Sequence, residues 1–234
     1  MNILVTGGNG QLGCSFREKA EGTDHRFIFA DVRPGGDMVL DATDLDAVCK
    51  AVSDNDIDVI MNCAGYTDVA RAETEEDLAF RINADAVANM AEAAKRNDAV
   101  LIHVSTDYVF DGTSGLPYKE DHAPSPVSAY GRSKLAGEKA VLDSGCRYMI
   151  FRIAWLYSRY GKNFVKTIYE KSAEKPVLNV VCDQVGTPTF AGDLVDLVIN
   201  IIDAGMLDRQ GTYNFTDEGV CLSLIHISEP TRRY

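Results

Sequence analysis

A tyrosine and a lysine four residues apart are the side chains of this sequence best suited to proton transfer. Tyr130 and Lys134 fall one helical turn apart on the same face if the segment around them is a helix. A tyrosine has an ordinary pKa of ~10, and a neighbouring cation favours the phenolate, so we expect Lys134 to lower the pKa of Tyr130. Each residue alone is more often part of a half-exposed helix face, so a catalytic interpretation needs further residues.

A hydroxyl side chain at the end of a strand supplies the next part. Thr106, between Ser105 and Asp107, follows the apolar segment 101–104, which predicts a buried parallel strand. Ligands bind at the carboxyl ends of such strands in open α/β sheets. There Thr106 can polarise a carbonyl oxygen with a hydrogen bond while Tyr130 protonates it. The chemistry indicated is reduction of a carbonyl group.

A glycine loop near the amino terminus is the expected source of the reductant. Gly7, Gly10 and Gly13 follow the predicted strand 2–6 directly and open a predicted helix. In such loops the glycines allow a tight turn, a close approach to a pyrophosphate and close helix packing, and the phosphates lie at the helix N-terminus. A nicotinamide dinucleotide is therefore predicted.

The ribose contact decides between the two nicotinamide cofactors. Asp31 lies eighteen positions after Gly13, at the end of the second predicted strand, and favours the free hydroxyls of NADH. Arg33 is near enough to neutralise a 2′-phosphate, so NADPH stays open. The expected cofactor-binding positions are Gly7, Gly10, Gln11, Leu12, Gly13, Asp31, Asp41, Ala42, Cys63, Ala64, Gly65, Tyr66, Tyr130 and Lys134.

Strands and helices alternate along the chain, which predicts an α/β fold: a Rossmann-type parallel sheet with helices on both faces. We expect strands at 2–6, 26–31, 59–63, 100–104, 148–155 and 211–215, an extended segment at 177–181, and helices at 10–19, 44–53, 74–96, 163–171 and 191–204, with one more helix capped by Ser128. Residues 1–155 are expected to form the NAD(P)-binding domain and residues 156–221 a smaller, incomplete substrate-binding lobe. Residues 222–234 resemble a translated sequencing adapter, so we expect a non-native tail on a C-terminally truncated chain.

Composition excludes several classes of partner. The net charge of −12 and the pI of about 4.7 argue against binding to nucleic acid or to an anionic membrane. The six cysteines form no Cys-x-x-Cys motif and no zinc-site spacing, so we expect free thiols in a reducing cytoplasm and no bound metal. No leader peptide and no apolar run of the ~18 residues that span a bilayer is apparent.

The motifs together resemble the extended short-chain dehydrogenase/reductases and, within them, the dTDP-4-dehydrorhamnose reductases. The matching segments are MNILVTGGNGQLG at 1–13, VIMNCAGYTD at 59–68, STDYVFDG at 105–112, YGRSKLAGE at 130–138, RIAWLY at 152–157, GKNF at 161–164 and DQVGTP at 183–188. The resemblance implies reduction of the 4-keto group of dTDP-4-dehydro-6-deoxy-L-mannose to dTDP-L-rhamnose by NADPH or NADH.

The resemblance also assigns roles. It implies Thr106, Tyr130 and Lys134 as the catalytic residues, and its expected substrate contacts are Thr106, Asp107, Trp155, Asn163 and Phe164. It allows a homodimer. Some relatives dimerise around Mg²⁺, but Ser15 stands where a relative has a ligating glutamate, so no structural metal is predicted.

Three other functions share features with this sequence. A related dehydratase needs a second acid at the strand end, where this chain has Tyr108. A sugar-nucleotide epimerase would share the cofactor and the Tyr/Lys pair but would recycle the nicotinamide. A non-catalytic regulatory subunit, like the relative that binds methionine adenosyltransferase, would have no need of Tyr130 and Lys134.

Overall fold

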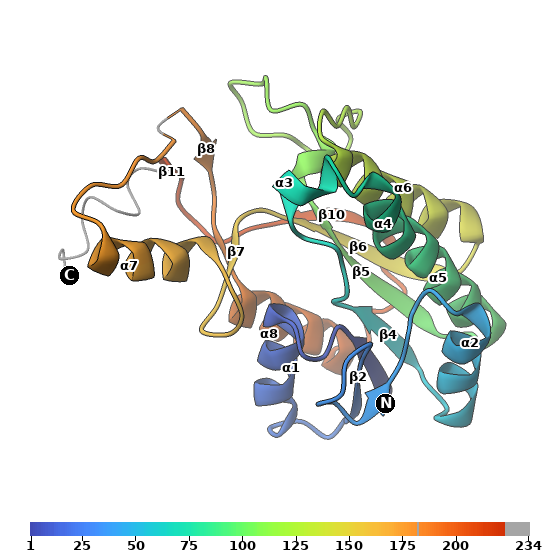
Figure 1. The fold of residues 1–234 in the computed structure, drawn as a ribbon. Helices are drawn as coiled ribbons and strands as arrows, with labels where there is room; N and C mark the ends of the chain where they lie inside the picture. The colour runs from blue at the N-terminus through green and yellow to red at the C-terminus, as the bar shows by residue number, and fades with distance from the viewer. Residues whose placement is uncertain (182, 223–234) are drawn as a thin grey trace.

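A computed structural model describes residues 1–181 and 183–222. These residues are built around a seven-stranded parallel sheet, which forms the centre of the molecule in Figure 1. The strand order is β10-β6-β5-β4-β1-β2-β3. The strands are β1 (Asn2–Thr6), β2 (Arg26–Asp31), β3 (Met38–Val39), β4 (Val59–Asn62), β5 (Val100–Thr106), β6 (Arg147–Ile153) and β10 (Gly211–Phe215). The order reverses between β1 and β4, where dinucleotides bind in Rossmann-type sheets, so the predicted fold class is confirmed.

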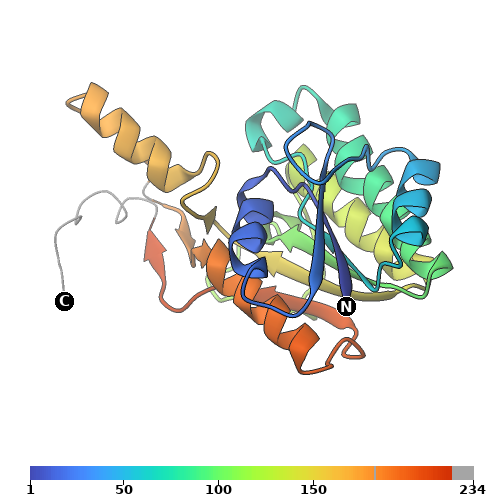
Figure 2. The same cartoon turned by 90° about the horizontal axis from the view of Figure 1, so that it is seen from below.

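Helices cover both faces of the sheet (Figure 2). Apolar side chains of α1 (Gln11–Ala20) and α8 (Ala191–Asp203) share one core with one face. Those of α2 (Leu45–Asp54), α5 (Ala86–Arg96) and α6 (Ala129–Ser144) form a second core on the other face. Both cores are needed because a parallel sheet is apolar on both sides.

The long helix expected at 74–96 is divided in the structure. After the short helix α3 (Val69–Ala72), helix α4 (Glu76–Phe80) passes into a π-helical turn, η1 (Arg81–Asp85), and then into α5. A π-helical turn inserts an extra residue and changes which side chains face inward. Asn83 in this turn is buried and bonds to the backbone of Tyr66, accepting from its N–H at 2.8 Å and donating to its carbonyl at 3.0 Å.

The division expected at residue 155 does not match the arrangement of the later elements. β10 pairs in parallel with β6, in the register Gly211↔Met149 to Phe215↔Ile153. α8 packs against α1, and its buried side chains belong to the same core. Residues 191–215 thus complete the Rossmann-type sheet. Their apolar periodicity revealed a core-facing helix but not which core it covers.

The remaining segments after β6 are small and lie to one side of the sheet (Figure 1). Helix α7 (Phe164–Glu174) has no buried residue. The strands β7 (Leu156–Tyr157) and β9 (Thr189–Phe190) pair in parallel, and β8 (Val185–Gly186) and β11 (Cys221–Leu222) pair antiparallel. Residues 177–181, expected to be extended, lie in neither a helix nor a paired strand. Of the expected tail, Leu222 pairs with Val185, and 223–234 lie outside the described residues.

Within the described part of the chain, no helix is both long and apolar enough to cross a bilayer.

Candidate active site

The glycine loop is a tight turn in which side chains would collide. Gly7 has a positive φ of 65°, and its carbonyl accepts a 2.9 Å hydrogen bond from the N–H of Gly10. A Cβ on Gly7 would lie 2.7 Å from the Ala64 nitrogen, and one on Gly13 would overlap the Gly7 carbonyl oxygen. Gly10 is the N-cap residue of α1 and has no side chain, so it offers no side-chain acceptor to the first N–H groups of the helix. These features fit a pyrophosphate.

Asp31, at the end of β2, lies beside this loop. Its buried carboxylate accepts hydrogen bonds from the backbone N–H of Asn9 at 3.1 Å and of Arg33 at 3.0 Å. The Arg33 side chain is 76% exposed, with Nε 3.7 Å from Asp31 Oδ1. A carboxylate and a guanidinium therefore stand together where a ribose would lie.

The other predicted cofactor positions follow β4 or precede α2. Backbone atoms of Cys63 and Ala64 lie against Gly7, so these two residues border the glycine loop. Burial raises the pKa of the Cys63 thiol far above its ordinary value. Asp41 accepts from the hydroxyl and the N–H of Thr43, and these hydrogen bonds lower its pKa. The Ala42 carbonyl accepts from the side chain of Asn89 at 3.1 Å. Asp41 and Ala42 therefore already have partners within the protein.

Thr106, Asp107 and Tyr130 converge at the carboxyl end of β5. Thr106 Oγ1 donates to Asp107 Oδ1 at 3.0 Å and accepts from the N–H of Tyr108 at 3.2 Å. The rings of Tyr108 and Tyr130 meet edge to face, with centroids 5.5 Å apart. Burial raises the pKa of Asp107, and hydrogen bonds, including that from Thr106, oppose the shift. Two hydroxyl groups therefore lie close together at the edge where a substrate carbonyl would bind.

The structure contradicts the expectation that Lys134 lowers the pKa of Tyr130. Burial raises the pKa of Tyr130 to about 12, a hydrogen bond with Thr106 opposes the shift, and the charges of Asp107 and Tyr108 add to it. Lys134 Nζ instead donates a 2.7 Å hydrogen bond to the carbonyl of Val104. Burial lowers the pKa of Lys134 to about 8. The phenol therefore stays protonated at neutral pH and can serve as a proton donor.

Helix α6 is held in place by its cap and by two glycines. Ser128 caps the helix as predicted, accepting from the N–H of Gly131 at 3.0 Å. A Cβ on Gly131 would overlap the carbonyl oxygen of Tyr108, and one on Gly137 would overlap that of Asn83. The helix backbone thus lies directly against the turn after β5 and against η1, which brings Tyr130 to Thr106.

The residues expected to contact substrate beyond residue 150 have different environments. Asn163 is buried and caps α7: its Oδ1 accepts from the N–H of Lys166 at 3.0 Å, and its Nδ2 donates to Gln11 Oε1 at 2.9 Å and to the carbonyl of Ser158 at 2.7 Å. Phe164 begins α7 and is 44% exposed. Trp155 has a positive φ of 47°, and its indole packs against Gly186. The structure thus gives Asn163 a role in joining α7 to α1.

Several buried polar residues near the site received no role from the sequence. Among them are Asn83, His103, Glu138 and Arg152. Asn83 Nδ2 donates to Ser133 Oγ at 3.0 Å, and Ser133 Oγ donates to the carbonyl of Tyr130 at 2.8 Å. The position of Glu138 one turn after Lys134 was visible in the sequence, but its burial was not.

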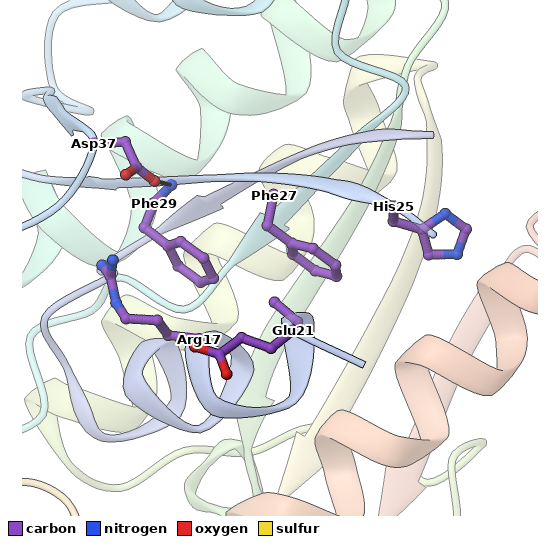
Figure 3. Close-up of a pocket in the computed structure, with 7 residues that line it drawn as sticks. Arg17, Glu21, His25, Phe27, Phe29 and Asp37 are labelled. Atoms are coloured by element: carbon purple, nitrogen blue, oxygen red, sulfur yellow. Dashed lines mark hydrogen bonds between the residues drawn. The ribbon is translucent and has the colours of Figure 1, made fainter. Parts of the chain in front are cut away.

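A separate hollow lies between α1 and β2 (Figure 3). Its volume is about 310 Å³, and Arg17 lies over the ring of Phe29, 4.2 Å from its centroid. It contains none of the residues of the glycine loop or of the Thr106–Tyr130 cluster. Across residues 1–181 and 183–222, no group of three or more His, Cys, Asp or Glu side chains is arranged to hold a metal ion.

These features define a Rossmann-type protein of the short-chain dehydrogenase/reductase kind. They are the strand order of the sheet, the glycine loop at the point where that order reverses, and the cluster of Thr106 and Tyr130. The family model of the RmlD substrate binding domain matches residues 1–226. The chain belongs to this family.

Individual relatives agree with this assignment. The dTDP-4-dehydrorhamnose reductase of Sinorhizobium fredii is 39% identical over 94% of this chain and 73% of its own length. A probable dTDP-4,6-dihydroxy-2-methyloxan-3-one 4-ketoreductase of Streptomyces antibioticus is 42% identical over 86% of this chain and 67% of its own. The solved dTDP-4-dehydrorhamnose reductase of Bacillus anthracis, in complex with NADP, is 36% identical and has a TM-score of 0.89 over 97% of this chain and 79% of that one.

Proposed function

We propose that this protein reduces the 4-keto group of dTDP-4-dehydro-6-deoxy-L-mannose, forming dTDP-L-rhamnose with NADPH or NADH as the reductant. The observation that carries the proposal is the convergence of Thr106 and Tyr130 at the carboxyl end of β5. A carbonyl oxygen between these groups would be polarised by one and protonated by the other. Family membership supports the choice of a dTDP-sugar as substrate.

The cofactor is supported by the shape and donors of its predicted site. The backbone of the glycine loop and the start of α1 fit a pyrophosphate, and Asp31 with Arg33 fits a ribose with or without a 2′-phosphate. When bound, the nicotinamide supplies the hydride. The crystal structure of the Bacillus anthracis relative with NADP supports NADPH as a cofactor.

Each catalytic residue has a separate proposed task. Tyr130, protonated at neutral pH, gives its proton to the substrate oxygen as the carbonyl carbon is reduced. Thr106 donates a hydrogen bond to the same oxygen. Lys134, anchored by its hydrogen bond to the Val104 carbonyl, would hold the nicotinamide ribose. Asp107, Trp155 and Phe164 remain proposed substrate contacts.

The test is turnover by the Tyr130→Phe variant. With dTDP-4-dehydro-6-deoxy-L-mannose and NADPH, we expect nicotinamide absorbance to fall stoichiometrically with product, and kcat to drop about 10²- to 10⁴-fold in the variant. NADPH binding, measured by fluorescence, should be retained because the glycine loop is unchanged. Full activity of Tyr130→Phe would remove the phenol from the reaction.

The same assay separates the alternatives. An epimerase would convert its sugar without net consumption of nicotinamide. A regulatory subunit would bind a stable protein partner and oxidise no cofactor. The Streptomyces antibioticus relative motivates the related keto-sugar as a second substrate to be assayed.

A cytoplasmic location and a homodimer complete the proposal. The cysteines Cys14, Cys49, Cys63, Cys146 and Cys221 are free thiols, which supports a reducing compartment. The homodimer rests on the resemblance found in the sequence and is tested by the mass of the protein in solution.

A further inference from the structure

A buried ion pair lies beneath the proposed catalytic residues. Glu138 on α6 and Arg152 on β6 have side chains only 1% and 7% exposed. The guanidinium holds the carboxylate with two hydrogen bonds, Nε to Oε1 at 2.9 Å and Nη2 to Oε2 at 2.7 Å. Two parallel charge-assisted bonds fix both distance and orientation. Such a pair is costly to bury and is therefore a weak explanation of stability alone.

The ion pair is connected directly to the strand that carries Thr106. Ser105 Oγ donates to Glu138 Oε1 at 2.5 Å, so this carboxylate receives a third hydrogen bond. Ser105 and Arg152 are register partners on the neighbouring strands β5 and β6. The guanidinium also lies over the ring of Phe110, 5.1 Å from its centroid. The end of β5, α6 and β6 are thus joined at one carboxylate.

The same carboxylate lies one helical turn beyond Lys134. The lysine is buried between α6 and β5, where burial disfavours its charged form and the charge of Glu138 opposes that effect. From β5, His103 also faces this region. Its Nδ1 accepts from Asn62, and burial together with the charge of Lys134 keeps the imidazole neutral. On α6, Tyr130 is a neutral phenol at this pH. Because His103 and Tyr130 are neutral, Glu138 is the group among these whose negative charge can balance the positive charge of Lys134.

We propose that Glu138 and Arg152 form a positioning pair that fixes the Thr106 end of β5 against α6 and places a negative charge one helical turn from the Lys134 ammonium. Arg152 orients the carboxylate, and Glu138 acts on Lys134 through space and on Thr106 through Ser105. Both are positioning residues and not catalytic ones, because they are buried and their side chains bond to each other and to Ser105. The part of this proposal that concerns the use of Lys134 in catalysis rests on the proposed function. The part that concerns the charge of Lys134 does not.

The direct test is the titration of Lys134 in the whole protein without substrate. Lysine labelled with ¹³C at Cε reports each protonation, and the Lys134 signal is assigned by its loss in Lys134→Arg. In Glu138→Gln we expect Lys134 to lose its proton about one pH unit or more below the wild-type value. The matched control is Glu76→Gln, which removes the same charge from an exposed pair with Arg132 on α6. It should leave the Lys134 titration unchanged.

A second variant guards against loss of the fold. Removing one member of a buried pair leaves an uncompensated charge, so Glu138→Gln alone could unfold. In Glu138→Gln/Arg152→Gln both charges are gone and the two amides can bond to each other, and Lys134 should still titrate below the wild-type value. An unchanged titration in a folded variant overturns the proposal. Failure of both variants to fold also overturns it, because the pair would then be a requirement of the fold.

Two kinetic measurements separate charge from positioning. The alkaline limb of the kcat profile should move to lower pH in Glu138→Gln, together with the Lys134 titration. Arg152→Lys keeps the positive charge but loses the two parallel bonds, so kcat should fall while the Lys134 titration stays near the wild-type value. If the wild type shows no reductase activity while the titrations shift as expected, the proposed function fails and the positioning pair stands.

Discussion

Lys134 Nζ donates a hydrogen bond to the carbonyl oxygen of Val104, and Val104 lies on β5 two residues before Thr106. The lysine is therefore anchored to the same strand that carries the threonine. Burial in this position lowers the pKa of Lys134 to about 8, while burial raises the pKa of Tyr130 to about 12. Both residues are thus biased toward their neutral forms. For Tyr130 the neutral form is the proton donor that carbonyl reduction requires.

The lowered pKa of Lys134 predicts a specific dependence of stability on pH. Between pH 8 and the ordinary value of 10.5, the unfolded chain binds more protons at this lysine than the folded protein does. The contribution of Lys134 therefore makes the free energy of unfolding rise with pH across this window. Below it, the buried ammonium destabilises the fold by roughly 3 kcal/mol at most.

Lys134→Met, compared with the wild type by denaturant unfolding of the protein without cofactor, measures this effect. The variant should be more stable near pH 7, and its advantage should shrink as the pH approaches 10. Lys139→Met changes an exposed lysine on the same helix and serves as control, with a stability difference that does not vary with pH. A constant difference for Lys134→Met would contradict the lowered pKa.

The glycine loop predicts a loss of cofactor affinity without a change in chemistry. A Cβ at Gly13 would overlap the Gly7 carbonyl, so Gly13→Ala must displace the loop that fits the pyrophosphate. We expect the Kd for NADPH to rise at least about tenfold, which corresponds to ~1.4 kcal/mol. Gly22→Ala, just after α1, is the matched control because its Cβ would lie 3.7 Å from the nearest neighbour. Equal affinities in the two variants would show that the loop does not hold the cofactor.

The position of Arg33 predicts that the protein binds NADPH in preference to NADH. Its exposed guanidinium stands beside Asp31, so it can pair with a 2′-phosphate but gains little from a free ribose hydroxyl. Arg33→Ala should weaken NADPH binding about tenfold and leave NADH binding nearly unchanged, since hydrogen bonds between charged groups contribute about 1.5–3 kcal/mol. Arg26→Ala, at the opposite end of β2, should affect neither. Parallel losses for both cofactors would exclude a phosphate contact at Arg33.

The fold could be predicted largely because its signals are local. The glycine loop, the strand ends at Asp31 and Thr106, and the Ser128 cap all depend on residues close in sequence. β10 was visible as a strand, but its partner β6 lies about sixty residues earlier, and propensity does not record such pairings. The π-helical turn η1 was missed because its extra residue is stabilised by the long-range contacts of Asn83.

The electrostatics of the site could not be predicted from spacing. Tyr130 and Lys134 have the expected spacing on α6, but their pKa values follow burial, which depends on how α6 packs against β5. Glu138 and Arg152 are charged residues of types usually found at the surface. Their pairing became visible only when α6 and β6 were placed side by side.

Asn163 gives a prediction that separates a structural role from the substrate contact expected from the sequence. Its side chain caps α7 and joins Gln11 on α1 to the carbonyl of Ser158. Asn163→Ala should lower the free energy of unfolding by roughly 2 kcal/mol, from loss of the cap and of buried hydrogen bonds. Asn163→Asp retains an oxygen that can cap the helix but loses both donated bonds, so it should be intermediate. The measurements are thermal melting and the KM for the sugar nucleotide. If Asn163→Ala melts like the wild type and its KM rises steeply, the residue binds substrate and the structural role is wrong.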